Sequence, residues 1–157
     1  MKPKKSKIAG AIYTQTYVYN FHFHLIWITK YRRQVFTTPP LVQAMKAILQ
    51  RIADLNEIRI ETMEVMPDHV HLLISFKPKL SATDAVKALK GGSARLFFDA
   101  YPEIKAAKLW GGHLWTRSYY MSTLGNMSKE TVEQYIEDQY SKEALNKKRR
   151  SGLTSTD

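Results

Sequence analysis

The sequence predicts an α+β fold of the ferredoxin-like (RRM-like) type, a split βαβ antiparallel sheet with helices on one face and an added C-terminal helix. Four segments alternate in polarity as half-buried strands do, and three others repeat apolar residues at helical spacing. The segments follow one another as strand, helix, strand, strand, helix, strand, helix. The length of 157 residues is enough for one such domain with its own core.

The first strand is predicted from 18 to 29, where the alternation is clearest. Successive side chains of a strand lie on opposite faces of its sheet, so this segment presents two rows. The row facing the core is expected to be Phe21, Phe23, Leu25 and Trp27, and the opposite row His22, His24 and Ile26.

A helix is predicted over 40–55, where two prolines mark the first turn and apolar residues recur every three or four positions. A strand from 58 to about 65 follows, and a turn at Pro67 and Asp68 leads into a strand over 69–76. These two strands are therefore expected to form a hairpin.

A second helix is predicted from a cap at Ser81 or Thr83 to about Ala100. Gly91 and Gly92 lie in its middle, where a glycine costs about 1 kcal/mol relative to alanine. Either close approach of a ligand or a simple kink would explain them.

A strand over 116–124 and a last helix over 129–145, capped by Ser128, complete the pattern. The first two helices are expected to cover the apolar face of the sheet and to leave the other face to the last helix.

The composition indicates one domain over 13–145, between a basic flexible leader at 1–12 and a basic disordered tail at 146–157. The formal charge of +10 and the basic ends favour a polyanionic partner, with nucleic acid first. The absence of cysteine excludes disulfides, thiolate zinc sites and cysteine nucleophiles. No apolar run reaches membrane-spanning length and no signal peptide is visible, so a cytoplasmic protein is expected.

Two clusters of cations are candidates for DNA contact. Lys30, Arg32 and Arg33 surround Tyr31, a combination suited to phosphate contact and base stacking, although a polar strand end would look the same. In the second helix, the candidate phosphate-binding residues flank the two glycines: Lys87, Lys90 and Arg95.

His69 and His71 are the candidate metal ligands. They would lie side by side on one face of the strand over 69–76, while its large apolar residues face the core. Two half-buried histidines without a metal would give the same pattern, so the interpretation needs a third ligand. In the last helix, Tyr135 and Gln139 lie one turn apart on one face, where Gln139 can offer an amide oxygen.

A phenol near a bound divalent cation can attack a phosphodiester and form a covalent phosphotyrosine, which keeps the bond energy for rejoining. Tyr119, Tyr120 and Tyr140 are alternatives for this role, but none has a glutamine four residues later. Tyr135 is therefore the preferred nucleophile. Plain core packing of Tyr135 is the competing interpretation.

Four segments together resemble the single-tyrosine HUH transposases of the smallest bacterial insertion sequences, the TnpA type. They are 66–75 (MPDHVHLLIS), 25–32 (LIWITKYR), 86–91 (VKALKG) and 135–139 (YIEDQ). Their order and spacing are preserved from about Tyr17 to Gln139.

The resemblance implies that His69, His71 and Gln139 bind Mg²⁺ or Mn²⁺, and that Tyr135 forms a 5′-phosphotyrosine on single-stranded DNA. It also implies recognition of DNA hairpins at element ends and a homodimer whose active sites can mix residues of two chains. Two alternatives remain at this point: a domesticated relative acting on chromosomal hairpin repeats, and a non-catalytic module that binds single-stranded nucleic acid.

Overall fold

The computed structural model describes residues 11–16, 18–108, 112–123 and 128–150. The strands are β1 (Ile12–Tyr13), β2 (Val18–Tyr19), β3 (His22–Ile28), β4 (Ile58–Met66), β5 (His69–Phe76) and β6 (Tyr120–Ser122). The helices are the short 3₁₀ helix η1 (Lys30–Arg32), α1 (Pro39–Leu55), α2 (Ala82–Ala100), α3 (Pro102–Lys108) and α4 (Lys129–Arg150). No helix in these ranges is both long and apolar enough to cross a membrane.

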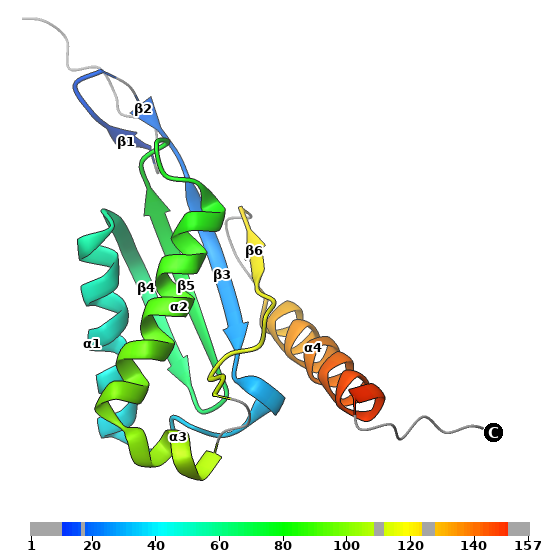
Figure 1. The fold of residues 1–157 in the computed structure, drawn as a ribbon. Coiled ribbons are helices and arrows are strands. Elements are labelled where there is room, and N and C mark those ends of the chain that lie inside the picture. The colour runs from blue at the N-terminus through cyan, green and yellow to red at the C-terminus, as the bar shows by residue number, and fades with distance from the viewer. Residues whose placement is uncertain (1–10, 17, 109–111, 124–127, 151–157) are drawn as a thin grey trace, which may run out of the picture.

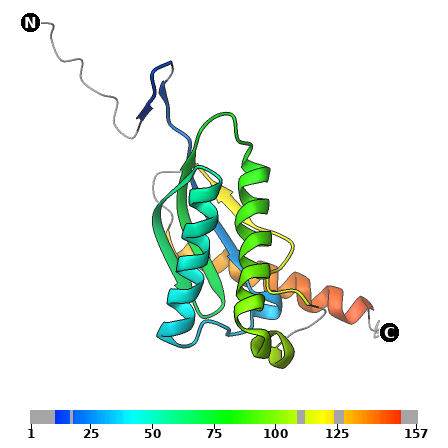
Figure 2. The same cartoon turned by 60° about the vertical axis from the view of Figure 1, so that its left-hand side comes forward.

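The main sheet has the strand order β4-β5-β3-β6, and every neighbouring pair is antiparallel. This is the order of a ferredoxin-like split βαβ fold, so the predicted fold class is confirmed. Helices α1 and α2 cover one face of the sheet, and α4 lies on the other side (Figures 1 and 2). The predicted division of the two faces is also confirmed.

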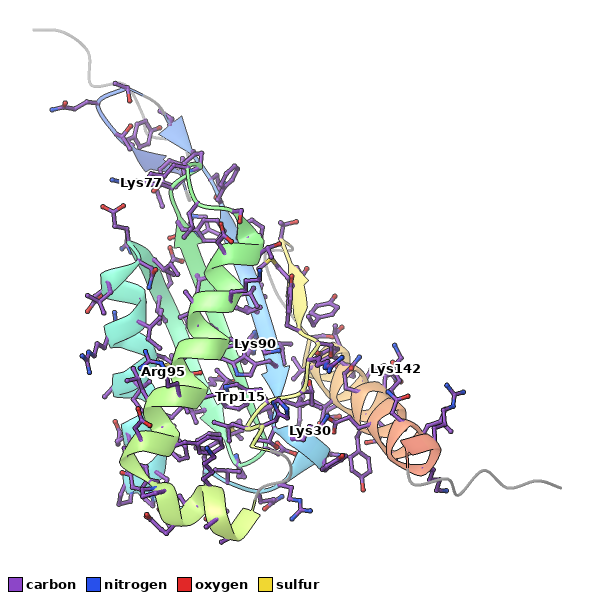
Figure 3. The ribbon with its side chains drawn as sticks, viewed as in Figure 1. Lys30, Lys77, Lys90, Arg95, Trp115 and Lys142 are labelled. Atoms are coloured by element: carbon purple, nitrogen blue, oxygen red, sulfur yellow. The ribbon has the colours of Figure 1, made fainter. Side chains whose placement is uncertain are left out.

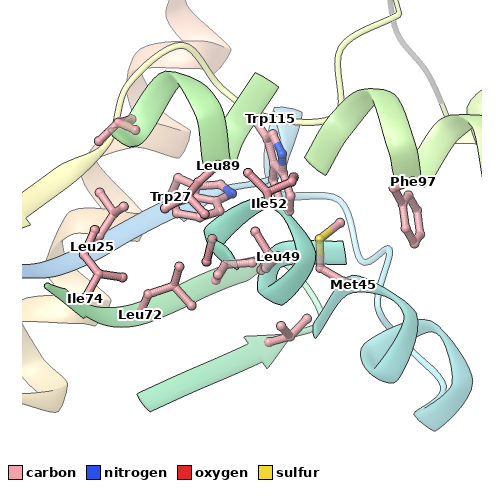
Figure 4. Packing of buried hydrophobic residues seen from close by; sticks show 14 of the residues in the cluster. Leu25, Trp27, Met45, Leu49, Ile52, Leu72, Ile74, Leu89, Phe97 and Trp115 are labelled. Atoms are coloured by element: carbon pink, nitrogen blue, oxygen red, sulfur yellow. The ribbon is translucent and has the colours of Figure 1, made fainter. Parts of the chain in front are cut away.

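The core lies between the sheet and the pair α1 and α2, as Figure 4 shows. Trp27 of β3 is fully buried at its centre and meets Trp115 edge-on. Phe36 packs on both Trp115 and Phe97 of α2. Trp115 is therefore part of the core.

A bulge in β4 changes which residues of this strand face the core. The register against β5 shifts between Ile60 and Thr62, so one extra residue lies in β4. Before the shift, Ile58 faces the core, and after it Val65 does. The shift places Glu64 directly opposite His71, on the face that α4 covers.

Several predicted boundaries were wrong. The strand predicted over 18–29 is divided into β2 and β3, and Phe21 between them is 41% exposed instead of buried. Ile12 of the predicted leader pairs with Tyr19 in a small hairpin. At the other end, helix α4 continues to Arg150, into the segment predicted to be disordered.

The fourth strand of the main sheet is also shorter than predicted. Among the described residues, the regular ladder with β3 covers Tyr120–Ser122. Before it, Thr116 donates to the carbonyl of Ile28, while the carbonyls of Thr116 and Ser118 accept from Lys90. Helix α3 was not predicted, since Pro102 was interpreted only as the end of α2. The cap of α2 was predicted correctly, because Ser81 accepts a hydrogen bond from the amide of Asp84.

Candidate active site

His69 and His71 lie on the sheet face opposite the core. The apolar residues that alternate with them in β5 are buried as predicted: Val70, Leu72, Ile74 and Phe76. Both imidazoles are only partly exposed, because α4 covers this region of the sheet. The sequence therefore placed the histidine pair on the correct face.

Asp68 fixes the orientation of His69. Its Oδ1 lies 2.8 Å from His69 Nδ1, and its Oδ2 accepts a hydrogen bond of 3.0 Å from Arg32 Nε. Burial favours the neutral carboxyl, but the hydrogen bonds from His69 and Arg32 outweigh it and lower the pKa of Asp68. An ionised carboxylate can only accept, so the Nδ1–H of His69 donates a hydrogen bond to Asp68, and Nε2 is the nitrogen left to bind a metal ion.

His71 is held neutral by its surroundings. Burial lowers its pKa most strongly, and neighbouring His24 lowers it further, against an opposing effect of Glu64. The rings of His24 and His71 interact directly, with Nδ1 of the former 3.2 Å from Nε2 of the latter. Metal binding requires neutral imidazole, and His71 meets that condition.

The pair opens into a cavity of about 450 Å³ between the sheet and α4. The side chains of β4 and α4 that complete its lining are Glu64, Met66, Lys129, Val132, Glu133 and Ile136. Docking of the last helix on the histidine face, which the sequence predicted, is thereby confirmed. Neither Tyr135 nor Gln139 lines this cavity.

Tyr135 and Gln139 form a second group with Ser118. The phenol oxygen of Tyr135 lies 3.0 Å from Ser118 Oγ, and Ser118 Oγ donates to Gln139 Oε1 at 2.6 Å. The ring of Tyr135 also contacts Tyr120, with centroids 5.6 Å apart. Tyr135 and Gln139 share one helix face as predicted, but within this chain that face is turned toward Ser118.

The phenol of Tyr135 is not activated in this position. Burial raises its pKa, Ser118 lowers it through the hydrogen bond, and the charge of Glu143 raises it again, so that the pKa stands above its ordinary value. A protonated phenol is a weak nucleophile. The structure thus shows two separate groups of predicted site residues, one with the imidazoles and one with the tyrosine.

Helix η1 holds α4 in place. The backbone amide of Tyr31 donates to a carboxylate oxygen of Glu143, and Lys30 Nζ lies 3.6 Å from the other. Arg32, besides its bond to Asp68, donates to Glu137 at 2.9 Å. Tyr31 and Arg32 have φ angles of 56° and 53°, a left-handed backbone that directs these groups at the helix. We call these contacts of Lys30, Tyr31 and Arg32 with α4 the η1 clasp.

Lys90 supports the segment that carries Ser118. Its Nζ donates to the carbonyl oxygens of Thr116 at 2.7 Å and Ser118 at 2.9 Å. Burial lowers the pKa of Lys90 to about 8. Figure 3 shows Lys90 reaching from α2 toward this segment, and Lys30 close to α4.

The predicted DNA contacts therefore fall into different environments. Lys30, Arg32 and Lys90 are engaged with other parts of the chain, while Lys87 and Arg95 are exposed on the outer side of α2. Arg33 is half-buried, and its carbonyl accepts from the hydroxyl of Thr29 at 2.7 Å. Of the other histidines, His22 pairs with Glu61 and His113 is exposed.

The sequence analysis missed two residues that position the predicted site residues, Asp68 and Ser118. Asp68 was interpreted only as a turn residue, and Ser118 only as part of a strand. An acid directly before the histidine pair was a usable signal, because metal-binding imidazoles commonly donate their second N–H to a carboxylate. Nothing local in the sequence indicates the contact of Ser118 with α4.

The imidazoles of His69 and His71 could supply two nitrogen ligands to a divalent cation. His69 and His71 line one cavity, and burial holds His71 neutral by lowering its pKa. Within the described ranges, no group of three histidine or acidic side chains is arranged to hold a metal ion. A third ligand from the amide of Gln139 would therefore complete a site that the two imidazoles begin.

The family model described as Transposase IS200 like matches residues 17–139. The chain belongs to this family, the single-tyrosine transposases that its residue pattern resembles.

Individual relatives agree with this assignment. Over 127 residues the chain is 50% identical to the ISDra2 transposase TnpA of Deinococcus radiodurans, which covers 81% of this chain and 89% of that protein. It is 28% identical to the transposase for insertion sequence element IS200 of Salmonella typhimurium, covering 81% and 82%. The crystal structure of a candidate transposase from Deinococcus radiodurans R1 superposes with a TM-score of 0.74 at 44% identity, covering 82% and 97%.

Proposed function

We propose that this transposase is a metal-dependent enzyme that recognises hairpins in single-stranded DNA and cuts and rejoins the strand at the ends of an insertion element through a 5′-phosphotyrosine. The observation that carries the proposal is the pair His69 and His71, which lines one cavity beneath the helix that bears Tyr135. A non-catalytic binding module would not need Asp68 to leave a free nitrogen on His69.

In the proposed reaction, the phenol oxygen of Tyr135 attacks the phosphorus of a phosphodiester. A bond from tyrosine to phosphorus forms on the 5′ side, and the bond from phosphorus to the 3′ oxygen breaks. The phenol releases its proton and the departing 3′ oxygen takes one up. Rejoining is the reverse, with a 3′ hydroxyl attacking the phosphotyrosine, so no ATP is required.

The residues that would hold the metal ion are His69, His71 and the amide of Gln139. Mg²⁺ or Mn²⁺, when bound, polarises the phosphorus and aligns the attacking and leaving oxygens. Two imidazoles alone would favour zinc or manganese, and magnesium is included because of the family resemblance.

A homodimer with shared active sites is part of the proposal. Within one chain, Tyr135 and Gln139 lie against Ser118 and do not line the histidine cavity. Binding of α4 to the sheet of a second chain, or its rotation on its own sheet, would complete the site. The polar attachment of α4 through the η1 clasp supports this view, because such contacts can be exchanged without opening the core.

The decisive experiment is a search for the covalent intermediate. The full chain is incubated with Mn²⁺ and single-stranded DNA from the ends of its element, and the products are separated on a denaturing gel. A protein band carrying labelled DNA is expected for the wild type and not for Tyr135→Phe. Tyr140→Phe serves as the control and should keep the band. An adduct that persists in Tyr135→Phe would assign the nucleophile elsewhere.

A further inference from the structure

We propose that a small polar pocket between η1, the segment before β6 and α4 binds one backbone phosphate of a single DNA strand close to Tyr135. The pocket has a volume of about 170 Å³, and all three parts of the chain line it. Its charged residues are Lys30, Arg117, Lys142 and Glu143. This inference rests on the proposed function, because it assigns a place to the strand that the enzyme would cut.

The pocket carries an excess of positive charge. Three cations, Lys30, Arg117 and Lys142, surround it together with one acid, Glu143. Arg117 and Lys142 are exposed, and neither forms an ion pair with a carboxylate of the described residues. A surplus of cations around a small hollow favours an anionic ligand.

The cations belong to two parts of the chain that the η1 clasp joins. Lys30 of η1 and Arg117 lie on the sheet side of the pocket, while Lys142 lies on α4 (Figure 3 labels both lysines). Like charges that are brought together by docking of α4 repel one another. A phosphate between them would replace this repulsion by charge-assisted hydrogen bonds from both sides. The bound strand would therefore add to the attachment of α4.

Glu143 also points to a ligand in this pocket. Its side chain is only 8% exposed, and its Oε2 accepts a hydrogen bond from the backbone amide of Tyr31. Its buried Oε1 has no hydrogen-bond partner among the described residues, and Lys30 Nζ is 3.6 Å away. Burial raises the pKa of Glu143 most strongly, against opposing effects of Tyr31 and Lys30. A carboxyl that takes up a proton more readily than usual can donate it to a phosphate oxygen.

The pocket lies along the face of α4 that carries Tyr135. Gln139, Lys142 and Asn146 line it and follow Tyr135 by four, seven and eleven residues, which places all of them on one face of the helix. Tyr135 and Lys142 are therefore separated by about 10 Å along the helix axis. A strand of duplex DNA advances about 3.4 Å per phosphate and an extended strand advances more, so at most about three nucleotides separate the tyrosine from the pocket.

The lining suits an unpaired strand. Sites for single-stranded DNA combine cations with aromatic rings on which the bases stack. The half-buried Tyr31 lines the pocket, and Lys30 Nζ lies 5.2 Å from the centroid of its ring. A base next to the bound phosphate would stack on this ring, which a paired base inside a duplex cannot do.

The test measures binding of a fluorescent single-stranded oligonucleotide from the end of the element by anisotropy, without metal, so that no strand is cut. In a series of oligonucleotides, one phosphate at a time is replaced by an uncharged methylphosphonate. At one position we expect the wild type to lose about tenfold in affinity, the usual effect of losing a hydrogen bond between charged groups.

The variant Arg117→Gln/Lys142→Gln identifies the phosphate that the pocket holds. It should bind the unmodified strand about tenfold more weakly and lose its sensitivity to the methylphosphonate at that one position. Its salt dependence should be shallower by about 0.7 per lost phosphate contact, the value for single strands. The matched control, Arg59→Gln/Lys105→Gln, removes the same charge at exposed positions outside the pocket and should keep the sensitive phosphate.

Hydrogen exchange provides a second readout, with each protein saturated with the unmodified strand. The strand should slow amide exchange in α4 of the wild type, because the phosphate joins Lys142 to Lys30 and Arg117. It should slow this exchange less in Arg117→Gln/Lys142→Gln. A general attraction between a basic protein and DNA would not produce this difference.

Two outcomes would overturn the proposal. One is a double variant that keeps the sensitivity of the wild type at every phosphate. The other is a loss of affinity spread evenly over all phosphates of the wild-type complex, which would indicate diffuse attraction. Because the assay contains no metal and detects no covalent product, its failure leaves the covalent adduct test intact. Conversely, a missing adduct would overturn the proposed reaction and leave phosphate binding by the pocket unaffected.

Discussion

At the scale of single residues, the candidate site depends on one carboxylate. Asp68 lies between His69 and Arg32, and each of its oxygens contacts one of them. The two partners keep Asp68 ionised, and the ionised carboxylate keeps the proton of His69 on Nδ1. A residue that contacts no substrate thus determines which nitrogen of His69 is available.

We expect Asp68→Asn to weaken Mn²⁺ binding about 10- to 100-fold, the usual effect of removing such a carboxylate. The affinity is measured by calorimetry on the folded protein. In the metal-free protein, nitrogen NMR of His69 should show a loss of the pure Nδ1–H form, which a purely structural role would not produce. Asp54→Asn is the control, and an unchanged tautomer in Asp68→Asn would contradict the assignment.

At the scale of elements, the contact between Lys90 of α2 and the segment before β6 positions Ser118, which binds Tyr135. Lys90 donates to two carbonyl oxygens of that segment, and Ser118 within it binds both Tyr135 and Gln139. The same contact holds the carbonyls of Thr116 and Ser118 just before β6. Periodicity in the sequence cannot reveal such a contact, because it joins distant segments.

The buried Lys90 should leave a signature in the pH dependence of stability. Its pKa is about 8 in the folded chain and near its ordinary value of about 10.4 when unfolded. Between these values the unfolded chain holds the proton more often, so this group makes unfolding less favourable as the pH rises. The gain is at most about 1.4 kcal/mol per pH unit.

Urea denaturation at pH 8 and pH 10 measures this effect. The wild type should gain stability relative to Lys90→Met over this interval, because the variant lacks the titrating group. The difference between the two proteins cancels the other lysines and tyrosines. Identical changes in both proteins would show that Lys90 titrates normally.

The elements differ in how far the sequence predicts them. Helix α2 began at its serine cap and β5 alternated as expected, because caps and alternation are local signals. The bulge in β4 and the left-handed turn at Tyr31 were not predicted, since tertiary contacts select them. The histidines and the tyrosine remain predicted site residues, and their separation into two groups within one chain required coordinates.

At the scale of the whole molecule, the two faces of one sheet carry different groups. Helices α1 and α2 bury the core on one face, and the groove between them carries Arg51, Lys87 and Arg95. The other face carries the imidazoles and α4 (Figures 1 and 2). The order of helices and strands in the sequence was sufficient to predict this division. It was not sufficient to predict that the tyrosine would rest outside the histidine cavity.

A mixing experiment tests whether two chains complete each other. His71→Ala and Tyr135→Phe, each inactive alone, are co-expressed and assayed for the covalent adduct. If α4 acts on a neighbouring chain, the mixture should regain part of the wild-type adduct, because one chain supplies the imidazoles and the other the phenol. Light scattering should show a dimer. No recovery in a mixture shown to contain mixed dimers would restrict the site to a single chain.

Helix α4 is attached mainly by charged and polar groups, with Ile136 as its most deeply buried apolar side chain. Release of α4 would therefore expose little apolar surface to water, and the remaining domain would stay soluble and folded. In the proposed reaction, the tyrosine that is joined to DNA moves with it to a second reaction partner. A helix attached mainly through polar contacts is suited to such a movement, because its release leaves the core closed.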